Sequence, residues 1–112
     1  MTDIINIAID FTKFPGGRYP QDGEGNGTSF REKFLLPVLK ANKTAEVILD
    51  GALGYPSSFL EEAFGGLVRT DGYSPEKVLA TFTFIAKQPG FQRFVKLIES
   101  YVRGAVVTPS VA

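Results

Sequence analysis

Residues 45–68, AEVILDGALGYPSSFLEEAFGGLV, decide the fold. The run VIL near its start has three consecutive aliphatic residues, which is typical of a short strand buried on both faces. After a turn with glycine and proline, apolar residues from Phe59 onward recur at the spacing of one helical face. We therefore predict a strand over 45–50 and then a helix that begins at Ser58, where Glu61 completes a capping box.

The chain before this unit is predicted to hold a strand, a loop and a helix. Isoleucine or phenylalanine occupies every odd position from 5 to 11, so Ile4–Phe11 is predicted to be a strand with one apolar face. Residues 14–27 contain five glycines and two prolines, which excludes a regular helix and leaves either a mobile loop or a functional one. A helix is expected from Ser29, which opens a second capping box, with a kink or an early end at Pro37. Its charged residues, Arg31 among them, are expected to face water.

Three further elements are predicted downstream. Ser74 precedes a proline at the first helical position, so residues 75–80 are predicted to be a short helix. Residues 81–85 are β-branched or aromatic and indicate a strand, and a last amphipathic helix covers 91–103, after which the tail beyond Val107 is expected to fray. Strands that alternate with helices predict an α/β fold with a small parallel or mixed sheet of three strands, to which the glycine-rich loop could add a fourth.

The composition limits the classes of function. A chain of 112 residues has the size of one domain, so we interpret 1–112 as a single domain. Twelve basic residues balance twelve acidic ones, which gives no cationic excess for a nucleic acid or a membrane surface. The start of the chain lacks a signal peptide and no apolar run approaches about 20 residues, so a cytoplasmic location is expected. Cysteine and histidine are absent; we therefore expect no catalysis, metal or cofactor.

Two segments could carry a binding function. The loop over 50–58 follows a strand, where open α/β sheets gather ligands, and it leads into a helix whose free N–H groups suit an anion; alternatively, Ser58 only caps the helix. The other segment is the helix face opposite the apolar stripe, whose two adjacent glycines cost about 1 kcal/mol each relative to alanine. Those glycines are explained either by a partner that docks closely or by packing of the glycine-rich loop. This face consists of Ser58, Glu61, Glu62, Gly65, Gly66 and Arg69.

Two aspartates provide an alternative of a different class. Asp10 and Asp50 each end a predicted strand, and paired carboxylates in such a place can hold Mg²⁺ for phosphoryl chemistry. With the glycine-rich loop they would form a small phosphate- or nucleotide-handling enzyme. That loop lacks the Gly-Lys-Ser/Thr ending of a phosphate loop, however, and Arg18 is its only basic residue. A third possibility is an assembly subunit that forms a homodimer through the glycine face.

The strings VILDG at 47–51 and SSFLEEAFGGL at 57–67 resemble the STAS-like domains of unknown function, and the similarity extends from Ile4 to about Tyr101. That family is similar, more distantly, to the STAS domains of bacterial anti-sigma-factor antagonists. The resemblance implies a STAS-like fold and a bacterial regulatory module that binds a partner protein, with a histidine-kinase-like ATPase as the implied partner. It implies Ser57 as the phosphoacceptor. The implied docking surface is Ser57, Ser58, Glu61, Glu62, Gly65, Gly66 and Arg69.

Overall fold

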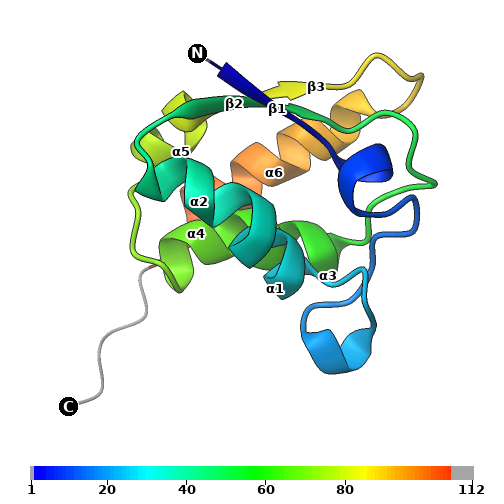
Figure 1. Cartoon of the computed structure of the whole chain (residues 1–112), viewed down its shortest axis with the longest axis horizontal. Coiled ribbons are helices and arrows are strands. Elements are labelled where there is room, and N and C mark those ends of the chain that lie inside the picture. The colour runs from blue at the N-terminus through cyan, green and yellow to red at the C-terminus, as the bar shows by residue number, and fades with distance from the viewer. Residues whose placement is uncertain (1, 107–112) are drawn as a thin grey trace.

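Three parallel strands form the sheet on which the other elements are arranged (Figure 1). The computed structural model describes residues 2–106, so the predicted fraying of the tail beyond Val107 lies outside the described residues. The strand order is β1-β2-β3, and the register aligns Ile5 with Val47 and Val47 with Phe84. The predicted α/β fold with a small parallel sheet is confirmed, and the glycine-rich loop adds no strand within residues 2–106. The strands are β1 (Thr2–Asn6), β2 (Thr44–Ile48) and β3 (Phe82–Ile85).

Two long helical runs and two further helices complete the fold. The first run contains α1 (Gly27–Phe30), the wide turn η3 (Arg31–Leu35) and α2 (Leu36–Lys40). The second contains α3 (Ser57–Leu60), the wide turn η4 (Glu61–Gly65) and α4 (Gly66–Arg69), and we call it the α3–α4 helix. The remaining α-helices are α5 (Pro75–Thr81) and α6 (Gln92–Gly104), and a short 3-10 turn, η2 (Pro20–Asp22), lies in the glycine-rich loop. None of the helices within residues 2–106 is long and apolar enough to cross a membrane.

The helices cover one face of the sheet and leave the other open. In Figure 1, α2, α4 and α6 pass below the strands. Accordingly Ala45 and Val47 on the lower face of β2 are buried, whereas Glu46 and Ile48 on the upper face are only half-buried. On the edge strand β1 the upper face leaves Ile4 63% exposed. The prediction of a strand buried on both faces is therefore wrong, because no layer lies above the sheet within the described residues.

The first predicted strand ends five residues early. After Asn6 the chain turns into a short helical segment, η1 (Ile7–Phe11). The Asn6 side chain accepts a hydrogen bond from the backbone N–H of Ile9, and the Asp10 carboxylate accepts one from the backbone N–H of Asn6 at 2.8 Å. These local side-chain hydrogen bonds compete with strand pairing and end the strand, and with it the alternation of buried and exposed side chains. As a result Ile9, predicted on the apolar face, is 78% exposed.

The first helical run begins earlier than predicted, and of the two outcomes predicted at Pro37, a kink or an early end, the early end does not occur. Asn26, not Ser29, caps it: the Asn26 side chain is 1% exposed and accepts a hydrogen bond from the Ser29 N–H at 2.8 Å. Pro37 does not end the helix. In the wide turn η3, which precedes Pro37, the N–H of Leu36 donates to the carbonyl of Arg31. This wider turn accommodates a break in the regular pattern of helical backbone hydrogen bonds. Arg31 is buried at 3% exposure, so its predicted contact with water is wrong.

The downstream elements agree with the sequence patterns. Ser74 caps α5 by accepting a hydrogen bond from the N–H of Lys77 at 3.1 Å, and Pro75 stands at the first helical position. The strand β3 and the amphipathic helix α6 follow in the predicted order. Between the helical layer and the sheet, aromatic rings fill the core: Phe30 packs against Phe59 with ring centroids 5.8 Å apart.

Candidate functional site

The helix that carries most of the predicted site begins one residue before Ser58. Pro56 has an extended backbone, and its carbonyl accepts hydrogen bonds from the N–H groups three and four residues later, at 3.1 and 3.2 Å. The first helical residue is therefore Ser57, and the predicted capping box from Ser58 to Glu61 is wrong. Ser57 is exposed and Ser58 is half-buried. Neither hydroxyl makes a hydrogen bond to any atom of residues 2–106.

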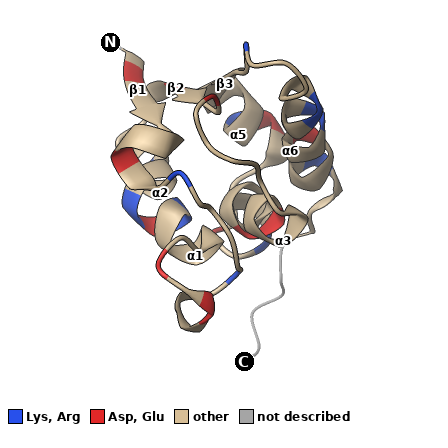
Figure 2. Ribbon diagram, turned by 90° about the vertical axis from the view of Figure 1, so that its right-hand side faces the viewer, with Lys and Arg blue, Asp and Glu red and all other residues tan. Residues whose placement is uncertain are grey.

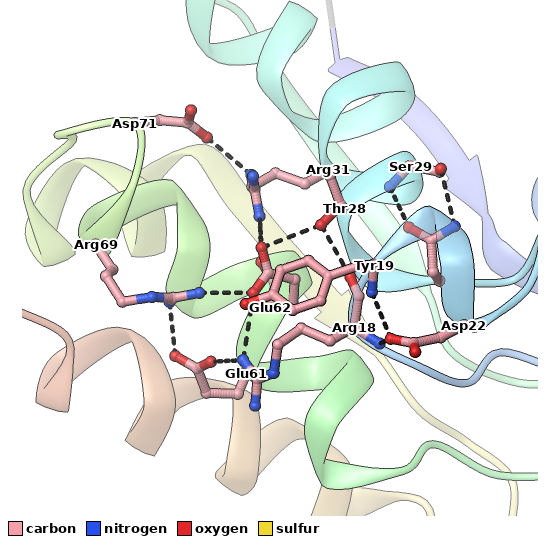
Figure 3. A network of polar contacts seen from close by, with 11 residues as sticks. Arg18, Tyr19, Asp22, Thr28, Ser29, Arg31, Glu61, Glu62, Arg69 and Asp71 are labelled. Atoms are coloured by element: carbon pink, nitrogen blue, oxygen red, sulfur yellow. Dashed lines mark hydrogen bonds and ion pairs between the residues drawn. The ribbon is translucent and has the colours of Figure 1, made fainter. Parts of the chain in front are cut away.

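The middle of the same helix holds a cluster of charged side chains, drawn in Figure 3. At its centre Glu62 is 3% exposed. Its Oε2 lies 2.6 Å from Nη1 of Arg31, and its Oε1 lies 2.7 Å from Nη2 of Arg69 and 3.2 Å from Nη1 of Arg18. Arg31 Nη1 also donates to the Glu62 backbone carbonyl at 2.7 Å, and Arg31 Nε lies 3.0 Å from Oδ2 of Asp71. With Glu61 included, we call this set the Glu62 cluster.

The Glu62 cluster fastens the glycine-rich loop to the α3–α4 helix. Arg18 of the loop pairs with Glu61 as well as with Glu62. Behind it, the N–H of Thr28 donates to the Arg18 carbonyl at 3.0 Å and the N–H of Gly27 donates to the Gly17 carbonyl at 3.0 Å. The loop of the same chain therefore packs on this helix face at Glu61 and Glu62, but it does not account for Gly65 and Gly66, which lie against other groups.

Ion pairs and burial set the pKa values of the charged groups in the Glu62 cluster. Burial alone would raise the pKa of Glu62, but hydrogen bonds from Arg31 and Arg69 outweigh it and lower that pKa to about 2. For Asp71 burial dominates and raises its pKa in spite of the attraction to Arg31. The hydrogen bond to Glu61 raises the pKa of the Arg18 guanidinium. Three arginines thus face three carboxyl groups, which is an arrangement that holds segments together.

The adjacent glycines of the helix make room for this cluster and for α6. A Cβ atom at Gly66 would meet the guanidinium of Arg31. A Cβ atom at Gly65 would lie 2.9 Å from Oε2 of Glu61 and 3.5 Å from the backbone carbonyl oxygen of Tyr101 in α6. Both glycines are buried. The prediction that they form a flat face open to solvent is therefore wrong, because Arg31 lies against Gly66 and α6 lies against Gly65.

An exposed apolar rim lies instead beside the start of the helix. Phe14 is 67% exposed and Leu53 is 78% exposed, and with Pro56 and Arg93 they border a shallow hollow of about 480 Å³. Two loops meet here, since the Leu53 N–H donates to the backbone carbonyl of Lys13 at 3.0 Å. Figure 2 looks onto this end of the molecule.

Ser57 does not line the hollow, but it is exposed and follows Pro56 in the chain. We call Phe14, Leu53, Pro56, Ser57 and Arg93 the Ser57 surface. The chain carries no charged residue from position 51 to position 60. Sequence reasoning found Ser57 but missed Phe14 and Leu53. The available signal was a large apolar residue in each of two glycine-containing loops, where no helix or strand pattern needs it.

The two aspartates of the enzymatic alternative each serve the backbone. The Asp50 carboxylate accepts hydrogen bonds from the N–H groups of Lys87 and Gln88, at 2.9 and 2.7 Å, and so ties the end of β2 to the loop after β3. Asp10 lies in η1 rather than at a strand end, and it accepts from Asn6 as described above. Within residues 2–106 no group of three or more carboxylates is placed to hold a metal ion.

Comparison with known families places these features in context. Residues 26–89 match a family described as a STAS-like domain of unknown function (DUF4325). The match begins at the cap of α1 and includes Ser57 and every member of the Glu62 cluster except Arg18. No curated protein and no solved structure matches the chain. Because the matched segment covers more than half of the 112 residues, the chain belongs to the STAS-like domains of unknown function.

Proposed function

We propose that this protein is a regulatory module that binds a partner protein through the Ser57 surface and does not act by catalysis. The supporting observation is the pair of exposed apolar side chains, Phe14 and Leu53, around one hollow. Clustered exposed apolar side chains on a small domain mark interaction sites. Arg93 at the border adds the residue type that is enriched in interface centres along with aromatic residues.

Ser57 is the residue through which this binding would be regulated. Its side chain is exposed, its hydroxyl is not engaged within residues 2–106, and it occupies the first position of α3. A phosphate there would add about two negative charges next to the apolar rim. The positive end of the helix would favour that phosphate by about 0.3–1 kcal/mol, so the fold would tolerate it while the docking surface would change.

The resemblance to anti-sigma-factor antagonists suggests a histidine-kinase-like ATPase as the partner, and also a role in bacterial regulation. The docking surface in this proposal differs from the segment from Ser57 to Arg69: of that segment it keeps only Ser57, and it adds residues that border the hollow. The buried residues Glu62, Gly65 and Gly66 serve the fold, so they are excluded from direct contact with a partner.

The proposal is tested with the wild-type chain as bait in an extract of its host, followed by affinity measurements on the recovered and purified partner. Leu53→Asp should weaken that affinity at least about tenfold, because a charge would enter the apolar centre. Ile9→Asp is the matched control: Ile9 is also 78% exposed but does not line the hollow. Equal losses for both variants, or none for Leu53→Asp, would overturn the proposal.

A further inference from the structure

A second surface lies along the free edge of β1. Within residues 2–106 this strand pairs only with β2, and in Figure 2 it forms the outer edge of the sheet above α2. A groove of about 430 Å³ runs between the strand and the first helical run. Its lining is Asp3, Ile4, Ile5, Lys33, Phe34, Pro37, Val38, Ala41 and Lys43. No residue of the Ser57 surface belongs to it.

The backbone of β1 can accept another strand. The Asn6 N–H bonds to the side chain of Asp10 and not to β2. Since the N–H and C=O groups of a strand point to alternate sides along the chain, those of Ile4 point away from β2 as well. Ile4 is 63% exposed, so its surroundings leave this edge accessible. At Ile4 the edge therefore has no strand partner within residues 2–106, and an unpaired strand edge is a template for pairing with another chain.

The groove beside this edge has an apolar floor and a positive rim. Phe34, Pro37 and Val38 come from the helical side and supply apolar surface. Lys33 and Lys43 are both exposed, and against these two positive charges the lining holds one carboxylate, that of Asp3. A strand laid here would place alternate side chains toward the floor and would bring acidic groups near the lysines.

We propose that β1 binds an extended acidic segment of a partner protein as a fourth strand of the sheet, with apolar side chains in the groove and acidic ones at Lys33 and Lys43. Strand addition of this type takes its affinity from backbone hydrogen bonds and its specificity from pockets for alternate side chains. A second copy of this chain is the weaker occupant. Its own β1 spans five residues and offers a single acidic side chain, Asp3, for two lysines.

The experiment uses the full chain and a phage-displayed library of random linear dodecapeptides. Peptides are selected on the wild-type chain and counter-selected on Ile4→Pro, which removes the edge N–H and is tolerated on an edge strand. Selected peptides should carry more Asp and Glu than Lys and Arg. In NMR titrations of the labelled chain with the synthesised winner, shifts should map to residues 2–6 and 33–43. Ile4→Val keeps the N–H and should bind like wild type.

A second variant keeps the test decisive if Ile4→Pro does not fold. Lys33→Glu with Lys43→Glu should bind the winning peptide about tenfold more weakly, with a smaller difference in high salt. The charge-matched control on α6, Lys96→Glu with Arg103→Glu, should not change the affinity, and neither should Leu53→Asp, which separates this site from the Ser57 surface. Failure to enrich peptides, shifts at the Ser57 surface, or a dimer paired through β1 in light scattering and NMR would each overturn the proposal.

Discussion

The start and the middle of the α3–α4 helix differ in what surrounds them. At the start, Ser57 is exposed and the preceding residues carry no charge. In the middle, Glu62 and Gly66 are buried against Arg31 of the first helical run, and Gly65 is buried against α6. The residues that look most like a docking face in the sequence are thus internal. The part of the helix that is exposed is its uncharged start, at Ser57.

This comparison shows why charge and glycine on one helix face do not by themselves indicate exposure. The α3–α4 helix crosses the first helical run closely: a Cβ atom at Gly27 would lie 2.8 Å from the backbone carbonyl oxygen of Phe59. At such a crossing a long side chain from one helix can cover the polar face of the other. Arg31 does so, and its ion pair with Glu62 reduces the cost of burying the two charges.

The largest expected effect comes from filling the space beside Arg31. Gly66→Ala places a Cβ atom against the guanidinium of Arg31 and pushes it from Glu62. Breaking a buried ion pair costs about 3–5 kcal/mol, and the better helix propensity of alanine returns about 1 kcal/mol. The free energy of unfolding, measured with urea, should therefore fall by about 2–4 kcal/mol.

Gly104→Ala is the matched control for that variant. Gly104 is the last residue of α6, and a Cβ atom there would have nothing within 4 Å. Its unfolding free energy should stay within about 0.5 kcal/mol of wild type or rise. A neutral or stabilising effect of Gly66→Ala would mean that Arg31 can move away from Glu62 at little cost in stability. The ion pair would then not hold the middle of the helix in place.

Acid should weaken the middle of the helix. The pKa of Glu62 is lowered from 4.5 to about 2 in the folded chain. A lowered pKa contributes stability that is complete above pH 4.5 and is lost as the pH falls towards 2, by on the order of 3 kcal/mol. Urea unfolding measured between these pH values should show this loss. Glu62→Gln, although less stable at neutral pH, should lose less over the same range.

Protonation of Asp71 has the opposite effect on the free energy of unfolding. Its pKa is raised, mainly by burial, so the folded chain binds its proton more readily than the unfolded chain does and gains stability as the pH falls through that value. Asp71→Asn removes this gain, and the acid-induced loss of stability should become steeper. A wild-type unfolding free energy that does not fall between pH 4.5 and 2 would contradict the role given to Glu62.

The two candidate caps of the first helical run differ by a smaller amount. Asn26 is buried, accepts a hydrogen bond from the N–H of Ser29, and donates one to the carbonyl of Gly23 at 2.7 Å. Asn26→Ala should therefore lower the free energy of unfolding by about 1–2 kcal/mol. Ser29→Ala should cost less, because Ser29 contributes only a side-chain contact to Asn26 at 3.0 Å. The reverse order in chemical denaturation would place the cap at Ser29.

The sequence was sufficient for the fold class because its signals are local. The β2 run, the stripe of α3–α4 and the proline-led start of α5 each depend on a few adjacent residues, and all three elements are present. The misplaced boundaries have local causes of their own. At Asn6 and Asn26 an asparagine side chain caps a helical turn, whereas the patterns favoured a strand or a later serine.

The candidate site was less predictable because burial depends on distant segments. Nothing adjacent to Arg31 indicates that its guanidinium lies against Gly66 and Glu62, thirty or more residues away. Similarly, the hollow beside Ser57 depends on the approach of the Phe14 and Leu53 loops. Periodicity identifies which residues share a face of one helix, but not what covers that face.

The smallest expected effects are at the start of the α3–α4 helix. They test whether the Ser57 and Ser58 side chains are free of a structural role. Because no side chain caps α3, Ser57→Ala and Ser58→Ala should each change the free energy of unfolding by less than about 0.5 kcal/mol. Ser57→Asp should raise it by about 0.3–1 kcal/mol, since the carboxylate meets the positive end of the helix, and salt should reduce that gain. In affinity measurements with the partner recovered by the wild-type chain, Ser57→Asp should bind more weakly and Ser57→Ala like wild type. A cost of about 1 kcal/mol or more for Ser58→Ala would mean that the Ser58 hydroxyl caps the helix in solution and that the helix starts later than Ser57. Ser57 would then no longer be the first residue of the helix, and its assignment as the regulated residue would fail.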